Sequence, residues 1–154
     1  TRYKERMEKV KISPHQTLTV ASIIEIEGNK TEDREKISRV IYNRLNKKMS
    51  LGSDVTTYYA VRVEVGERNL YSKEIETFNS YNTRGPNMAG KLPIGPICNP
   101  SDESIDAALH PENGDYLYFV ADKNGDIYFT NTYEEHQAQI AQLKRKGLWF
   151  EYNE

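Results

Sequence analysis

The sequence is poor in the residues that form disulfides and bind metals. It has one cysteine, Cys98, so neither an intrachain disulfide nor a thiolate metal site can form. Its three histidines, His15, His110 and His136, are far apart and lack the spacing of a zinc motif such as HExxH. The sequence therefore offers no spacing typical of a disulfide framework or of a metal site.

Charge and hydropathy further narrow the class of protein to which this sequence could belong. With 21 basic and 23 acidic residues the net charge is −2, which gives no argument for a nucleic-acid partner. No apolar run approaches the roughly 18 residues of a membrane helix. The chain starts at Thr1, and we expect a piece of a longer protein: residues 1–13 form a charged lead-in, and 14–154 form one domain with its own core.

Hydrophobic periodicity and turn residues predict an α+β domain with its helices first and a small antiparallel unit near the end. The first long helix is expected over 14–27, because Ser13 is a good N-cap, Pro14 suits the first helical position and Gln16 completes a capping box. The next expected elements are a helix capped by Thr31 that runs to about Lys47 and a short helix over 53–62 capped by Ser53 or Asp54. A short helix over 102–110, a hairpin over 115–132 turning at Asn124-Gly125 and a last helix over 133–146 follow. Residues 64–80 are ambiguous.

Residues 81–100, YNTRGPNMAGKLPIGPICNP, hold four of the six prolines and three glycines, which predicts a long loop without regular structure. Long loops inside compact domains are usually functional or disordered. Leu92, Ile94 and Ile97 argue against disorder, because a disordered segment would be more polar. The loop is therefore expected either to wall a cleft or to cross the domain as a rigid connection.

Two carboxylates, Glu25 and Glu27, lie in the most apolar predicted helix. A carboxyl held in apolar surroundings has a raised pKa and can donate a proton at neutral pH, as a general acid does. The alternative is that one or both pair with an arginine, such as Arg39 or Arg44, and stabilise the fold. Composition and spacing leave both interpretations open.

Five motifs, in order, carry a family resemblance: ASIIEIEG, ISRVIYNRLNKKMSLGSDVTTYYA, YNTR, LPIGPICNPSDESIDAALHP and DYLYFVADKNGDIYFTNTYEEH. Together they resemble the MltG (YceG-like) endolytic murein transglycosylases over residues 17 to about 145. One departure is VTTYYAV, where many members carry PT after SD. The resemblance implies cleavage of nascent peptidoglycan between N-acetylmuramic acid and N-acetylglucosamine, leaving a 1,6-anhydro end.

The resemblance also implies Glu25 as the catalytic acid of a reaction that needs no metal and no cofactor. A lytic transglycosylase needs no second carboxylate as nucleophile, because the 6-hydroxyl of the muramic acid attacks its own anomeric carbon. Glu25 would protonate the leaving oxygen and then take the proton from that hydroxyl. We expect Glu25→Gln to abolish cleavage and Glu27→Gln to leave much of it, and the reverse result would mean that the wrong carboxylate was chosen.

Family members have a cytoplasmic end, one membrane helix and an extracytoplasmic part with a LysM-like subdomain before the catalytic one. The resemblance therefore places this chain, as the catalytic subdomain, at the extracytoplasmic face of the bacterial membrane. Its partners would be glycan strands and, beyond them, peptidoglycan synthases and proteins of the division and elongation machineries. The alternative function is a non-catalytic glycan-binding or scaffold module of a cell-wall synthesis complex.

Further candidates for substrate binding come from the loop and from the third helix. Asn82 is expected to face Glu25 across the cleft, although an Asx-turn at the start of the loop would explain it equally well. Near the third helix, the polar residues Ser53, Asp54 and Thr56 could either cap that helix or line the cleft. The full candidate set is Tyr81, Asn82, Ser53, Asp54, Thr56, Pro93, Gly95, Pro96 and Asn99.

Overall fold

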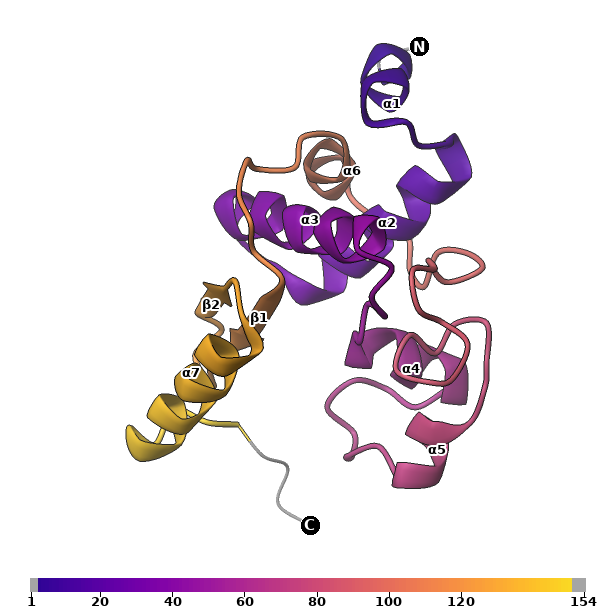
Figure 1. Ribbon diagram of the computed structural model, residues 1–154. Helices are drawn as coiled ribbons and strands as arrows, with labels where there is room; N and C mark the ends of the chain where they lie inside the picture. Colours follow the sequence, from indigo (N-terminus) through magenta and orange to yellow (C-terminus); the bar gives the residue numbers. More distant parts are fainter. Residues whose placement is uncertain (1–2, 151–154) are drawn as a thin grey trace.

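The computed structural model describes residues 3–150, which form seven α-helices and one two-stranded antiparallel sheet (Figure 1). The α+β class predicted from the sequence is confirmed. The elements are α1 Lys4–Val10, α2 Pro14–Glu27, α3 Thr31–Asn46, α4 Asp54–Val61, α5 Ser72–Glu76, α6 Asp102–Leu109, β1 Tyr118–Ala121, β2 Ile127–Thr130 and α7 Tyr133–Arg145.

Helices α2, α3 and α6 pack together to form the centre of the molecule. Helix α2 begins at the Ser13–Gln16 capping box, as its sequence predicts. Val20, Ile23 and Ile24 on α2 are at most 1 % exposed and pack against the apolar sides of α3 and α6. Burying an aliphatic side chain of this size contributes about 1.5–3 kcal/mol, so this helix is held firmly.

The hairpin and α7 form a smaller unit at one end of α3 (Figure 1). Phe119 pairs with Phe129 across the strands, and both rings pack on the central core. Gly125 takes the positive φ of 86° that the Asn124-Gly125 turn requires. Asp122 closes the turn, because its carboxylate accepts the Asn124 backbone N–H at 2.8 Å. The predicted hairpin is confirmed.

Two helix starts differ from the prediction. Thr31 is the first helical residue of α3 rather than its cap; the N-cap is Lys30, whose side chain makes no capping hydrogen bond. Ser53 is the N-cap of α4, but its hydroxyl does not cap that helix. The ambiguous region contains α5, which is held in place where Arg68 donates two hydrogen bonds to the Glu74 carboxylate.

The long loop over 81–100 contains no helix or strand, as predicted, yet it is tied to α2. The Ile97 backbone N–H donates to the Ser22 hydroxyl at 3.0 Å, and the His15 ring lies 2.8 Å from the Ile94 carbonyl oxygen. Side-chain contacts from two turns of one helix therefore fix the second half of the loop as a rigid surface beside α2.

Candidate functional site

Glu25 lies at the N-terminus of α6 rather than in an apolar pocket. Its Oε2 accepts hydrogen bonds from the hydroxyl of Ser104, from that of Ser101 at 2.7 Å and from the Ser101 backbone N–H at 3.4 Å. The Ser104 hydroxyl, then the Ser101 hydroxyl, hold the pKa of Glu25 below its usual value. The expectation that apolar surroundings raise this pKa is therefore wrong: Glu25 is ionised at neutral pH and joins α2 to α6.

We expect Glu25→Gln to lose stability at neutral pH and to match the wild type in acid. A lowered folded-state pKa contributes stability above the unfolded pKa, and that contribution is lost as pH falls through the folded pKa. Urea denaturation of both proteins across the acid range measures this. A difference in unfolding free energy that stays constant with pH would contradict an ionised Glu25.

Glu27 is in the opposite electrostatic situation. It is half-buried at the C-terminal end of α2, where helix carbonyls disfavour a negative charge. The pKa of Glu27 is raised to about 7, mainly by burial and to a smaller extent by the charge of Asp54, while a hydrogen bond from the Ser53 hydroxyl at 3.0 Å opposes the rise only in part. Glu27, and not Glu25, is therefore the carboxyl of this helix that holds a proton close to neutral pH.

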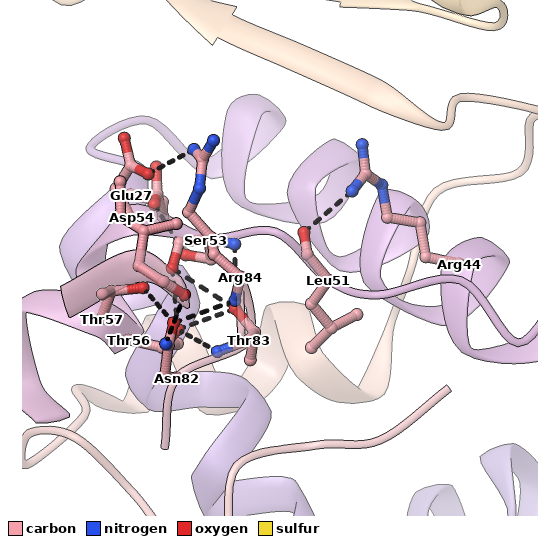
Figure 2. Close-up of polar contacts among 11 residues, drawn as sticks. Glu27, Arg44, Leu51, Ser53, Asp54, Thr56, Thr57, Asn82, Thr83 and Arg84 are labelled. Atoms are coloured by element: carbon pink, nitrogen blue, oxygen red, sulfur yellow. Dashed lines mark hydrogen bonds and ion pairs between the residues drawn. The ribbon is translucent and has the colours of Figure 1, made fainter. Parts of the chain in front are cut away.

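Neither arginine proposed as an ion-pair partner contacts these carboxylates. Arg39 donates through Nε to the Glu112 carbonyl oxygen at 2.5 Å. Arg44 donates to the Leu51 carbonyl oxygen at 2.9 Å and to two further carbonyl oxygens. Figure 2 shows Arg44 and Leu51 at the right and Glu27 at the left. The interpretation of Glu25 or Glu27 as an ion-pair partner of Arg39 or Arg44 is therefore wrong.

Figure 2 shows Glu27 beside the start of α4 and the first residues of the long loop. Ser53 donates to Glu27, and the next residue, Asp54, accepts from Arg84 Nη1 at 2.5 Å. Thr56 is fully buried, and its hydroxyl lies 2.7 Å from that of Thr83. Of the three polar candidates here, Ser53 contacts the Glu27 carboxylate and Asp54 contacts Arg84. Thr56 instead joins α4 to the loop through Thr83.

A groove of about 750 Å³ passes the Glu27 end of α2. Ile26 lies between the two glutamates in sequence and Val55 follows Asp54, and both line this groove. Tyr59 and Tyr81 meet edge to face in it, with ring centroids 4.8 Å apart. The other lining residues are Tyr58, Ala60, Arg62, Val63, Glu64, Val65, Asn79 and Ile97. Three of the twelve residues that line the groove are tyrosines, whose flat rings suit the faces of sugar rings.

Asn82 is a structural residue, contrary to its expected role in substrate binding. It is 1 % exposed, and its amide nitrogen is shared among carbonyl oxygens at the end of α5 and just beyond it. Its Oδ1 accepts from the Thr57 hydroxyl at 2.7 Å and from the Arg84 backbone N–H at 3.1 Å. No polar group of Asn82 is left to bind a sugar, so the proposed contact across the cleft is not available.

The remaining loop candidates divide by exposure. Pro93 and Gly95 are buried, Pro96 is half-buried and Asn99 is exposed. A Cβ at Gly95 would lie 3.4 Å from the Tyr81 hydroxyl, an ordinary contact distance, so the loop passes next to this groove residue without strictly requiring glycine there. A substrate-binding role for these four residues stays a prediction.

Sequence reasoning missed Tyr59 and Arg84. Both lie in motifs that were noted, VTTYYAV and YNTR, but neither motif indicates which side chain faces a groove or an acid. Among residues 3–150, no three His, Cys, Asp or Glu side chains are placed to hold a metal ion. In the same range, no helix has both the length and the apolar character needed to cross a membrane.

This chain is similar to known proteins in both sequence and fold. The YceG-like family model matches residues 1–142. An endolytic murein transglycosylase of Bacillus subtilis is 48 % identical over 134 residues, and one of Streptococcus pneumoniae is 33 % identical over 147 residues. The matches include 87 % and 91 % of this chain, which spans only 36 % and 26 % of those relatives' lengths.

A crystal structure of a yceG-like protein from Listeria monocytogenes superposes with a TM-score of 0.80 at 43 % identity. That superposition covers 90 % of this chain and 44 % of the Listeria chain. The match in sequence and the match in fold thus extend over nearly all of the described residues. This chain belongs to the YceG-like family.

Proposed function

We propose that this chain is the catalytic part of an endolytic murein transglycosylase, with Glu27 as its general acid and base. The observation that carries the proposal is the half-buried Glu27 carboxyl, whose pKa is raised to about 7. Its sequence neighbour Ile26 lines the groove that contains Tyr59 and Tyr81. The similarity to endolytic murein transglycosylases of Bacillus and Streptococcus supports the reaction class. The lowered pKa of Glu25 argues against the acid role that the sequence led us to expect for it.

One carboxyl can carry out both proton transfers of this reaction, first as an acid and then as a base. Protonated Glu27 donates its proton to the glycosidic oxygen between N-acetylmuramic acid and N-acetylglucosamine, and the bond from that oxygen to the muramyl anomeric carbon breaks. The resulting carboxylate takes the proton from the muramyl 6-hydroxyl as this oxygen attacks the same carbon. A 1,6-anhydro ring forms, Glu27 is protonated again, and no water is consumed.

The side chains around Glu27 and the groove suit this reaction. The Ser53 hydroxyl donates to the Glu27 carboxylate, which supports the ionised state between the two proton transfers. Tyr59 and Tyr81 offer flat apolar surfaces with polar edges, which suit the faces of sugar rings. The rigid second half of the long loop holds one side of the groove through Ile97. Orientation of the scissile bond by such fixed walls can supply several kcal/mol of the barrier.

The test is the formation of anhydromuramyl ends on purified peptidoglycan strands, measured by mass spectrometry. We expect internal cleavage products with 1,6-anhydro termini. The rate should fall as pH rises above about 7, because the acid must start protonated. Strands that bind the protein but stay intact would identify the alternative, a non-catalytic glycan-binding or scaffold module. Products with reducing ends would instead show hydrolysis by water.

The same reaction defines where the protein works. Nascent glycan strands lie outside the cytoplasmic membrane, so we place the active chain at the extracytoplasmic face of a bacterial cell, tethered there by parts of the longer protein. Peptidoglycan synthases and division or elongation proteins are the partners that this location predicts. Crosslinking in cells followed by mass spectrometry tests both proposals.

A further inference from the structure

Two carboxylates and one guanidinium meet at the start of α4. Arg84 pairs with Asp54, with Nη1 and Oδ1 2.5 Å apart, while Glu27 receives a hydrogen bond from the neutral Ser53 hydroxyl. The Asp54 and Arg84 side chains are 56 % and 42 % exposed, so their pair adds little to stability. Its position next to Glu27 needs another explanation.

The arrangement is fixed by the backbone on both sides. Ser53 and Asp54 are consecutive, so one side chain reaches Glu27 and the next reaches Arg84. The Ser53 backbone N–H donates to the Thr83 hydroxyl at 2.9 Å, which joins the start of α4 to the residue before Arg84. The backbone segments that carry Asp54 and Arg84 are thus held side by side.

Other charged groups near this end of α2 are already engaged. Arg34 of α3 donates to the Gly28 carbonyl oxygen at 3.1 Å, and Arg44 of the same helix donates to backbone carbonyls. Glu25 is bound to the N-terminus of α6. Helix α4 contributes the charged side chain of Asp54 beside Glu27, and the long loop contributes that of Arg84.

We propose that Asp54 is a positioning residue that keeps the Arg84 guanidinium away from Glu27, so that Glu27 stays protonated for the acid step. This rests on the proposed function. An arginine that paired with Glu27 would lower its pKa by about 1–3 units and leave no proton to donate at neutral pH. By binding Arg84, Asp54 prevents this, and its own negative charge further disfavours ionisation of Glu27.

The pair of variants Asp54→Asn and Arg84→Gln separates this role from a structural one. Asp54→Asn releases Arg84 toward Glu27, and the pH at which the rate declines should fall by about one unit or more. Arg84→Gln removes the cation and should move that decline in the opposite direction. Asp126→Asn, which breaks the exposed Lys30–Asp126 pair elsewhere on the surface, is the matched control and should leave the pH profile unchanged.

Direct titration of the Glu27 carboxyl by carbon-13 NMR gives a second readout, independent of activity. Opposite pKa shifts in the two variants support the proposal. Shifts in the same direction, or equal losses of kcat without any shift, would overturn it. If the wild type forms no anhydro ends, the proposed function fails, but the NMR titration still decides whether Asp54 and Arg84 control the protonation of Glu27.

Discussion

Glu27→Gln is expected to remove glycan cleavage while leaving the fold intact, and Glu25→Gln is expected to retain most of the activity. Gln is nearly the same shape as Glu but cannot give and retake a proton. Loss of general acid and base help lowers a rate by about 10²- to 10⁴-fold. Anhydro-product formation measured with circular dichroism on the same samples tests this.

Glu25→Gln is the matched control, because it makes the same change two residues away on the same helix. Its amide oxygen can still accept from Ser101 and Ser104, so α6 stays in place. If the folded Glu25→Gln variant loses cleavage and the Glu27→Gln variant keeps it, the assignment from the sequence was right and the present one is wrong.

The stability of Glu27→Gln provides an independent check. A folded-state pKa of about 7, above the ordinary 4.5, means that the native state binds more protons between these values, so stability falls as pH rises through them. A neutral Gln avoids this loss. Above neutral pH the variant should therefore be more stable than the wild type, by on the order of 1–3 kcal/mol. Lower stability of the variant there would contradict a raised Glu27 pKa.

Asn82→Ala is expected to destabilise the domain by about 2–4 kcal/mol, because it leaves several buried polar groups without partners. The Asn82 amide serves the Glu74, Ile75 and Thr77 carbonyl oxygens, and its oxygen accepts from the fully buried Thr57 hydroxyl. Chemical denaturation of the variant and of the wild type measures the difference in unfolding free energy.

Asn99→Ala is the control, since Asn99 is exposed in the same loop and surface substitutions usually change stability by about 0.5 kcal/mol or less. The contradicting outcome is specific. An Asn82→Ala variant with wild-type stability but no cleavage would restore Asn82 as a substrate-binding residue, as its place in the YNTR motif first indicated.

Local chemistry allowed much of the fold to be predicted. Ser13, Pro14 and Gln16 determine where α2 begins, because they satisfy the free amides of a first helical turn within four residues. Asn124-Gly125 determines the hairpin in the same way, through a backbone conformation that glycine adopts readily. The prolines of the long loop exclude helix and strand without any reference to the rest of the chain.

The sequence by itself determined that two carboxylates lie at the end of a buried helix, and only the tertiary structure decided which of them keeps a proton. Glu25 meets Ser101 and Ser104, which are 76 and 79 residues away, and their hydrogen bonds keep it ionised. Glu27 meets Ser53, 26 residues away, in a half-buried place where burial favours the neutral form. A pKa depends on what surrounds a group in space, and residues far apart in the sequence supply those surroundings only after the chain has folded.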